Sequence, residues 1–255
     1  MFNFAHITDE LHCLHHCSAL SSFNKSTYGT LLNMTVKYQT WPMFTQLIRH
    51  ELPDTYNGLQ HLLEDHSFIE PTNCTQESPP SASPWTPRSL LDMIEAARRT
   101  SMSILLPPLL LLCSTIDTST FLSAAKAQNL DEGLQTEILD GRRRLGAHAQ
   151  HHIRQCLVRC RFDKPYCPTH QRSSVGGPTD DVDAIRILFF PFSAPVPVTA
   201  GSDAPCRMCV ADYWDTVARS KSTRKESWEQ LPLFWKLDSW EKLRADFSSL
   251  VDANR

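Results

Sequence analysis

Four cysteines in the second half of the chain have types and spacings that could bind a metal ion. Cys206 and Cys209 form a CxxC pair, in which a tight turn brings two sulfurs to one side of a tetrahedral ion. Zinc needs two further thiolate or imidazole ligands. Cys160 and Cys167, at the end of a long helical pattern, are the preferred second pair. We therefore predict a zinc site at Cys160, Cys167, Cys206 and Cys209.

Two alternatives remain open for these cysteines. Cys156 and His170 compete with Cys160 and Cys167 as ligands, because the interval between Cys160 and Cys167 is wider than in a usual zinc knuckle. The other interpretation is that the thiols are isolated side chains in a helical core with a loop between them. Free cysteine behaves as a small hydrophobic residue when it is buried.

A second group of metal-ligand types lies near the N-terminus, in the segment LHCLHHC. His12 and His16, or Cys13 and Cys17, would share one face of a helix and could reach one ion. The favoured interpretation is that the histidines line the exposed face of this helix and the cysteines the buried face, because no partner pair follows nearby.

Other sequence features limit the functional class. The motifs GxSxG, HExxH, GxGxxG and the P-loop are absent, so we expect no enzyme. The 25 basic and 28 acidic side chains give a net charge of −3, which argues against nucleic acid as a partner.

The N-terminus lacks signal-peptide features, and the apolar stretch 104–113 is short for a membrane span. We expect an intracellular protein, cytoplasmic or nuclear, that does not bind membranes.

Helical spacing of apolar residues predicts a mainly α fold to position these groups. The proline-rich segment 71–87 reads as a linker between helical regions 1–70 and 88–255. A long helix is expected over 131–162, with Gly141 and Gly146 as points where it could bend. The segment 163–205 is irregular, and its apolar run 185–192 is the one candidate strand.

The C-terminal region contains four of the six tryptophans and many basic residues. The spacing of Trp228, Leu231, Phe234 and Leu237 predicts that a terminal hairpin packs onto the body, in preference to forming a ligand-binding patch. Asp238 or Ser239 should cap a last helix that runs through Leu250.

Two basic groups are interpreted as solvated faces: Arg142, Arg143 and Arg144, and Lys221, Arg224 and Lys225.

Three stretches of the chain resemble BTB/POZ domain-containing proteins of mushroom-type fungi. LLNMTVKYQTWPMFTQLIRHEL resembles the LLRLATKYQ-type helix pair that closes the BTB domain, and SLLDMIEAARRTSMSILLPPLLLLCS resembles the helices that follow it. The most specific stretch is Cys206 and Cys209 followed by ESWEQLPLFWKLDSWEKL, which is similar to the closing pattern W..LP.FFGLP.WEEL. The resemblance covers residues 11–243, with the parts in the same order.

This resemblance implies a protein–protein interaction module, an adaptor or transcription-linked scaffold without catalytic activity. BTB domains are dimerisation modules that can recruit ubiquitin ligases or transcriptional partners. The paired cysteines around the family's variable loop correspond to Cys160 with Cys167 and to Cys206 with Cys209, which supports the grouping chosen above.

The chain departs from the family before Leu11, where the strands and the first helix of a BTB domain have no counterpart. We therefore expect residues 1–70 to be the helical tail of an incomplete BTB domain, and 88–255 a helical post-BTB module with a cysteine-rich loop. Homo-oligomers are expected only if the domain is completed upstream. The alternatives are a remnant without partners, or a metal-dependent oxidase, because ELHCLH resembles the HQLHCL motif of fungal secondary-metabolite oxidases.

Overall fold

The computed structural model describes residues 32–33, 86–163, 180–190 and 221–253, and the side chains of 154–163 and 221 lie outside this description. The described part is helical and contains no strand, which confirms the predicted mainly α fold. Its elements, in chain order, are α5 (Pro87–Arg99), η3 (Ser103–Leu105), α6 (Leu106–Ser114), α7 (Thr118–Ala127), α8 (Glu132–Asp163), α9 (Asp181–Phe189), α11 (Lys221–Glu229), η4 (Leu231–Trp235) and α12 (Trp240–Ala253).

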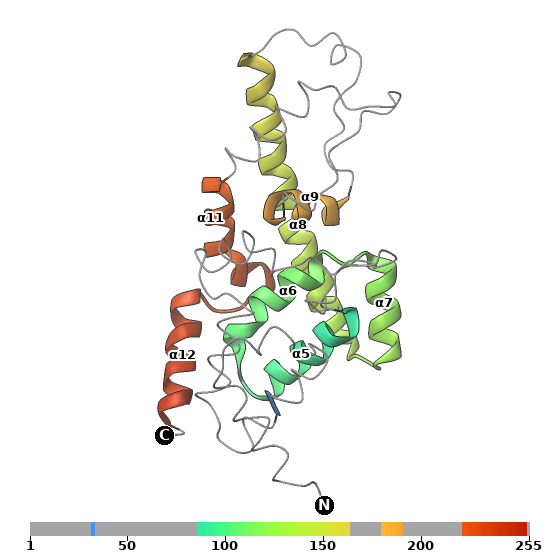
Figure 1. Ribbon diagram of the computed structural model, residues 1–255, viewed down its shortest axis with the longest axis vertical. Coiled ribbons are helices and arrows are strands. Elements are labelled where there is room, and N and C mark those ends of the chain that lie inside the picture. The colour runs from blue at the N-terminus through green and yellow to red at the C-terminus, as the bar shows by residue number, and fades with distance from the viewer. Residues whose placement is uncertain (1–31, 34–85, 164–179, 191–220, 254–255) are drawn as a thin grey trace, which may run out of the picture.

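The long helix α8 is the axis of this arrangement (Figure 1). It packs against α9, α6 and the short helix η4, while α5 packs against α6 and α7. The C-terminal helix α12 packs against η3. One end of α8 extends past the other described helices, so the core lies around its N-terminal half (Figure 1).

Helix α5 begins at a complete capping box. The amide of Ser89 donates to Thr86 Oγ1 at 3.1 Å, and the amide of Thr86 donates to Ser89 Oγ at 3.0 Å. Pro87 occupies the first turn, where a missing N–H costs nothing. The linker predicted over 71–87 therefore ends where this helix starts, and the rest of that segment lies outside the described residues.

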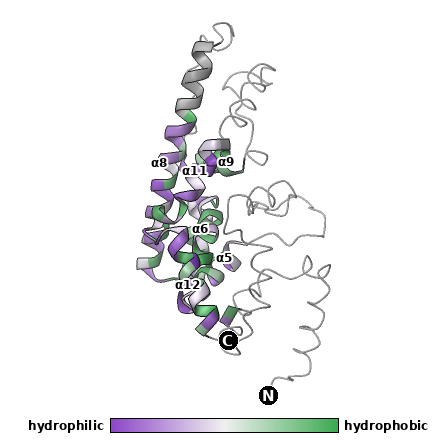
Figure 2. Cartoon of the chain, turned by 90° about the vertical axis from the view of Figure 1, so that its left-hand side faces the viewer, coloured by the Kyte–Doolittle hydropathy of each residue, from purple (hydrophilic) through white to green (hydrophobic). Residues whose placement is uncertain are grey.

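Helix α6 is buried along its whole length and follows the short helix η3 directly. Pro107 and Pro108 lie in its first turn, and every residue of the helix is buried. Figure 2 colours the helices of the described part by hydropathy, and α6 lies in a hydrophobic region. A short helix that is apolar all round is typical of a buried core element. None of the helices that the structure describes is both long and apolar enough to cross a membrane.

Helix α8 occupies almost the range predicted for it. Asp131 caps its start, accepting a hydrogen bond from the Leu134 amide at 3.0 Å. Leu134, Ile138 and Leu145, which recur at helical spacing, are buried, and Ile153 packs against the same core. The helix is continuous through Gly141 and Gly146. A Cβ at Gly141 would meet Trp235 of η4 and one at Gly146 would meet Asp181 of α9, so the two glycines let these elements approach the helix closely.

The strand predicted over 185–192 is wrong, because this segment begins within helix α9. The Asp180 carboxylate accepts from the Val182 amide at 2.9 Å and so caps the helix. Val182, Ile185 and Leu188 follow at helical spacing and are buried. A short apolar run fits a strand or a buried helix equally well, and here the cap and the packing on α8 select the helix.

The terminal segment packs onto the body as predicted. Trp228, Leu231 and Trp235 are buried, and Phe234 and Leu237 pack against the core. The amide of Leu243 donates to the Ser239 carbonyl at 2.9 Å, so α12 starts after Ser239, one of the two predicted caps. Its end is at Ala253, three residues past the predicted Leu250.

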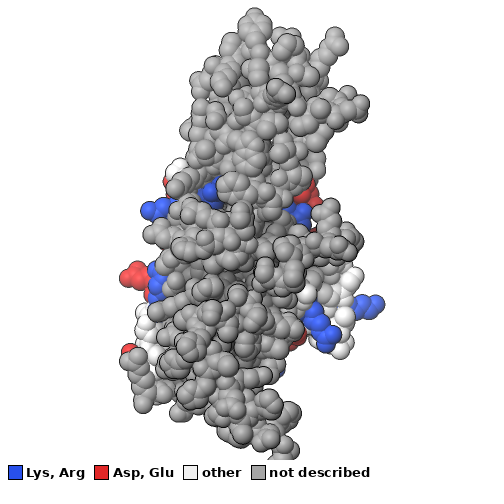
Figure 3. Space-filling view, in the orientation of Figure 1, with Lys and Arg blue, Asp and Glu red and all other residues white. Residues whose placement is uncertain are grey.

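One hydrophobic cluster joins the described elements. It includes residues of α5, α6, α7, α8, α9, α11, η4 and α12, and it also contains Leu32, whose side chain is fully buried. Apart from 32–33, the residues predicted for the BTB-like segment 1–70 lie outside the described part. On the face shown in Figure 3, the described charged side chains are mixed in sign.

Candidate functional site

The predicted zinc ligands lie almost entirely outside the described residues. Cys160 is on α8, where only the backbone is described, and Cys167, Cys206 and Cys209 are beyond the described ranges, as are the competing ligand His170 and the N-terminal cluster at 12–17. Among the described side chains, no group of three histidines, cysteines or carboxylates is arranged to hold a metal ion.

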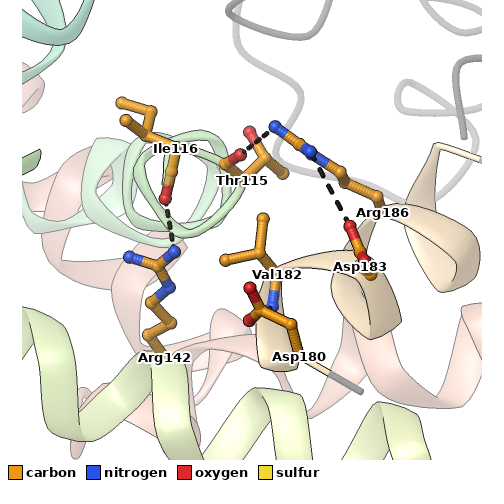
Figure 4. A network of polar contacts seen from close by, with 7 residues as sticks. All are labelled: Thr115, Ile116, Arg142, Asp180, Val182, Asp183 and Arg186. Carbon is orange, nitrogen blue, oxygen red and sulfur yellow. Dashed lines mark hydrogen bonds and ion pairs between the residues drawn. The ribbon is translucent and has the colours of Figure 1, made fainter. Parts of the chain in front are cut away.

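Two arginines donate to backbone carbonyls directly after the C-terminal end of α6 (Figure 4). Arg142 of α8 donates to the Ile116 carbonyl, and Arg186 of α9 donates to the Thr115 carbonyl at 2.7 Å. These two carbonyls follow Ser114, the last residue of α6, at the negative end of the helix dipole, so guanidinium groups stabilise them. Arg186 also lies 3.8 Å from the Asp183 carboxylate. These contacts join α6, α8 and α9.

The prediction that Arg142 lies on a solvated face is wrong, since its side chain is 4% exposed. Burial lowers the pKa of Arg142, and the nearby carboxylates of Asp180, Asp181 and Asp117 act in the opposite direction. Arg143 is exposed and Arg144 is partly buried. Successive residues of a helix point about 100° apart, so three adjacent arginines cannot all face solvent. Here one is buried, one is exposed and one is partly buried.

Arg224 is a second basic residue with a structural role that its sequence context did not indicate. It is 7% exposed, and its Nε donates to the Leu188 carbonyl near the end of α9 at 2.6 Å. Its neighbour Lys225 is exposed, as predicted for a solvated face. Arg224 thus connects α11 to α9.

Cys113 is the free cysteine whose side chain the structure describes, and it is fully buried in α6. Burial raises its pKa to about 12, and the charge of Arg142 acts against this shift. A nucleophilic cysteine needs an accessible thiolate. Cys113 is therefore a packing residue.

Three histidines lie on one face of α8, and one of them, His148, contacts the C-terminal segment. The rings of His148 and His152 lie 4.4 Å apart, and those of His151 and His152 lie 5.8 Å apart. His148 Nε2 lies 2.8 Å from Ser227 Oγ on α11, and its ring is 5.2 Å from that of Phe234 on η4. Spacings of three and four residues on a predicted helix are the signal by which this group could have been found.

The η4 turn presents one apolar side chain to solvent. Leu233 is 56% exposed, although Leu231, Pro232 and Trp235 beside it are buried. Arg144 Nε donates to the Phe234 carbonyl at 2.7 Å, and the Leu237 amide donates to the Pro232 carbonyl at 3.1 Å. Lys236 closes the turn in the left-handed conformation, with φ 58°. The backbone that carries Leu233 is therefore held at both ends.

Comparisons with family models, with curated proteins and with solved structures find no match for this chain.

Proposed function

We propose that this chain acts by binding another protein, as an adaptor or transcription-linked scaffold of the BTB-containing type without catalytic activity. The observation that carries the proposal is the exposure of Leu233 on a turn whose backbone is fixed. A side chain on a preorganised turn loses little conformational freedom when it binds.

The surroundings of Leu233 have the composition of a small interface. Glu229, Gln230 and Lys236 are exposed around it, and Phe234 is partly exposed. Protein interfaces commonly place an apolar anchor at the centre and polar residues at the rim. We infer that the partner offers an apolar pocket or groove to Leu233.

A binding measurement with a purified cullin-type scaffold tests the recruiter form of this proposal. We expect binding of the full chain, and a loss of about tenfold or more in affinity for Leu233→Asp. Leu122→Asp is the matched control, because Leu122 is the other exposed leucine of the described part, with 42% exposure, and lies on α7. Equal losses for the two variants, or no binding by the unaltered chain, would overturn the recruiter form.

A charge reversal tests whether the BTB-like segment takes part. Arg49 and Glu51 belong to the stretch that resembles the closing helices of a BTB domain. We expect Arg49→Glu or Glu51→Arg to weaken scaffold binding while the thermal unfolding temperature stays unchanged. Unaltered binding by both variants would assign recognition to the C-terminal surface alone.

A further inference from the structure

The contact between α8 and the α11–η4 segment is built around groups that can gain charge. His148 and His152 lie one turn apart on α8, and His151 is the neighbour of His152. The ring centroids of His148 and His152 are 4.4 Å apart, and those of His151 and His152 are 5.8 Å apart. The ring of His148 contacts both partner elements, through Ser227 of α11 and Phe234 of η4. This one residue therefore joins three elements.

The hydrogen bonds define the neutral form of His148. The Ser227 hydroxyl donates its single proton to the Thr223 carbonyl at 2.7 Å. It can therefore only accept from His148, so Nε2 of the ring carries the proton of that 2.8 Å bond. Acid must add the second proton at Nδ1, and the resulting charge would lie beside the other two imidazoles.

The environment opposes that charge. Burial, and then His152 and His151, lower the pKa of His148 to about 4. Burial and His151 also lower the pKa of His152, while Glu226 of α11 acts in the opposite direction on it. Thr223 and Ser227 on α11 and Phe234 on η4 are uncharged. Glu226 is thus an acidic group of α11 that offsets a charge on His152.

We propose that this contact is a pH-sensitive latch, in which neutral histidines hold α11 and η4 against α8 and their protonation releases both elements. This inference rests on the proposed function, because η4 carries the binding residue Leu233. In the released state the turn loses its support by Arg144, whose guanidinium donates to the Phe234 carbonyl. Acid would then weaken partner binding, because the turn that presents Leu233 would no longer be held in one conformation.

The direction follows from proton linkage. The released state exposes His148 and restores a pKa near its ordinary value, so below that pH the released state binds more protons than the closed state. The closed state is fully favoured above about pH 6.5 and loses its advantage as the pH falls towards 4. The ring is partly exposed, so we expect release to become about tenfold more frequent between about pH 7.5 and about pH 5.

Amide hydrogen exchange on the full chain tests the latch without any partner. Peptides from α11 and η4 should exchange about tenfold faster at about pH 5 than at about pH 7.5, after correction for the intrinsic pH dependence of exchange. Peptides from α5 and α6 should show no such change. An equal change in all peptides, or none in α11 and η4, would overturn the proposal.

The variant His148→Gln tests the residue itself. Its amide can donate to Ser227 but cannot gain charge, so protection at about pH 7.5 should persist and the acid response should fall. Arg143→Gln is the matched control, because Arg143 is exposed on α8 and is not one of the three histidines, so the response should be retained. If His148→Gln fails to fold, a nuclear magnetic resonance titration of His148 in the unaltered chain decides, since a pKa near 6.5 would overturn the latch. Failure of scaffold binding would leave these readouts unaffected.

Discussion

Gly141 of α8 lies directly against the indole ring of Trp235. A methyl group at Gly141 would lie 2.1 Å from both Cδ1 and Nε1 of that ring. The indole N–H is directed at the Ile138 carbonyl, 3.4 Å away on the same helix. The absence of a side chain at residue 141 thus lets a fully buried tryptophan reach the helix backbone.

Gly141→Ala should destabilise the protein although alanine favours helix. The buried Trp235 ring must move, and overpacking of this kind costs about 1–3 kcal/mol. Urea unfolding followed by circular dichroism measures the change. Gly133→Ala is the milder comparison, because its methyl group would lie against only Asp131 Oδ2, and loss of the cap that this oxygen provides costs about 1 kcal/mol. Equal effects of the two substitutions would contradict the role of Gly141.

Arg142→Met should remove the hydrogen bond to the turn after α6 while keeping much of the apolar part of the side chain. The buried Ile116 carbonyl then loses a charged donor, which costs about 2–3 kcal/mol. The exposed neighbour Arg143→Met should change the free energy of unfolding by less than about 0.5 kcal/mol. A small effect at Arg142 would show that water replaces the guanidinium.

Cys113 should resist alkylation in the folded protein. Burial raises the pKa of Cys113 to about 12, so the reactive thiolate does not form at neutral pH, and burial also keeps the reagent from reaching the sulfur. Peptide mapping after iodoacetamide treatment should find Cys113 unmodified in native buffer and fully modified in guanidinium chloride. Rapid modification of Cys113 under native conditions would contradict its packing in α6.

The cysteine set predicted from sequence has its own test. If Cys160, Cys167, Cys206 and Cys209 bind zinc, purified protein should retain the metal, and chelation should lower its thermal unfolding temperature. Cys160→Ser and Cys209→Ser should each lower that temperature, and the double variant should lower it little further, because either change breaks the same site. Equal stability with and without chelator would exclude a structural metal.

The sequence was sufficient to predict the helices that bury a regular apolar stripe. The range of α8 follows from Leu134, Ile138 and Leu145 at helical spacing, and the start of α12 follows from the Ser239 cap. The packing of Trp228 and Trp235 also follows from their spacing with Leu231. These predictions depend on local periodicity and capping, which a single sequence contains.

The errors concern features that only tertiary contacts decide. Whether the run after Ile185 forms strand or helix depends on its packing against α8. The burial of Arg142 and Arg224 depends on unpaired carbonyls of other helices, which have no mark in the sequence near either arginine. The histidine group at α8 was missed because its significance comes from Ser227 and Phe234, about 80 residues further along the chain.

Helix α9 is attached independently to three helices that precede or follow it. Asp181 near its start accepts from Gln150 of α8, Arg186 in its middle donates to the end of α6, and its Leu188 carbonyl accepts from Arg224 of α11. Because the three contacts come from three different helices, α9 is a common anchor, and α6, α8 and α11 cannot move apart from one another without first breaking a contact to it.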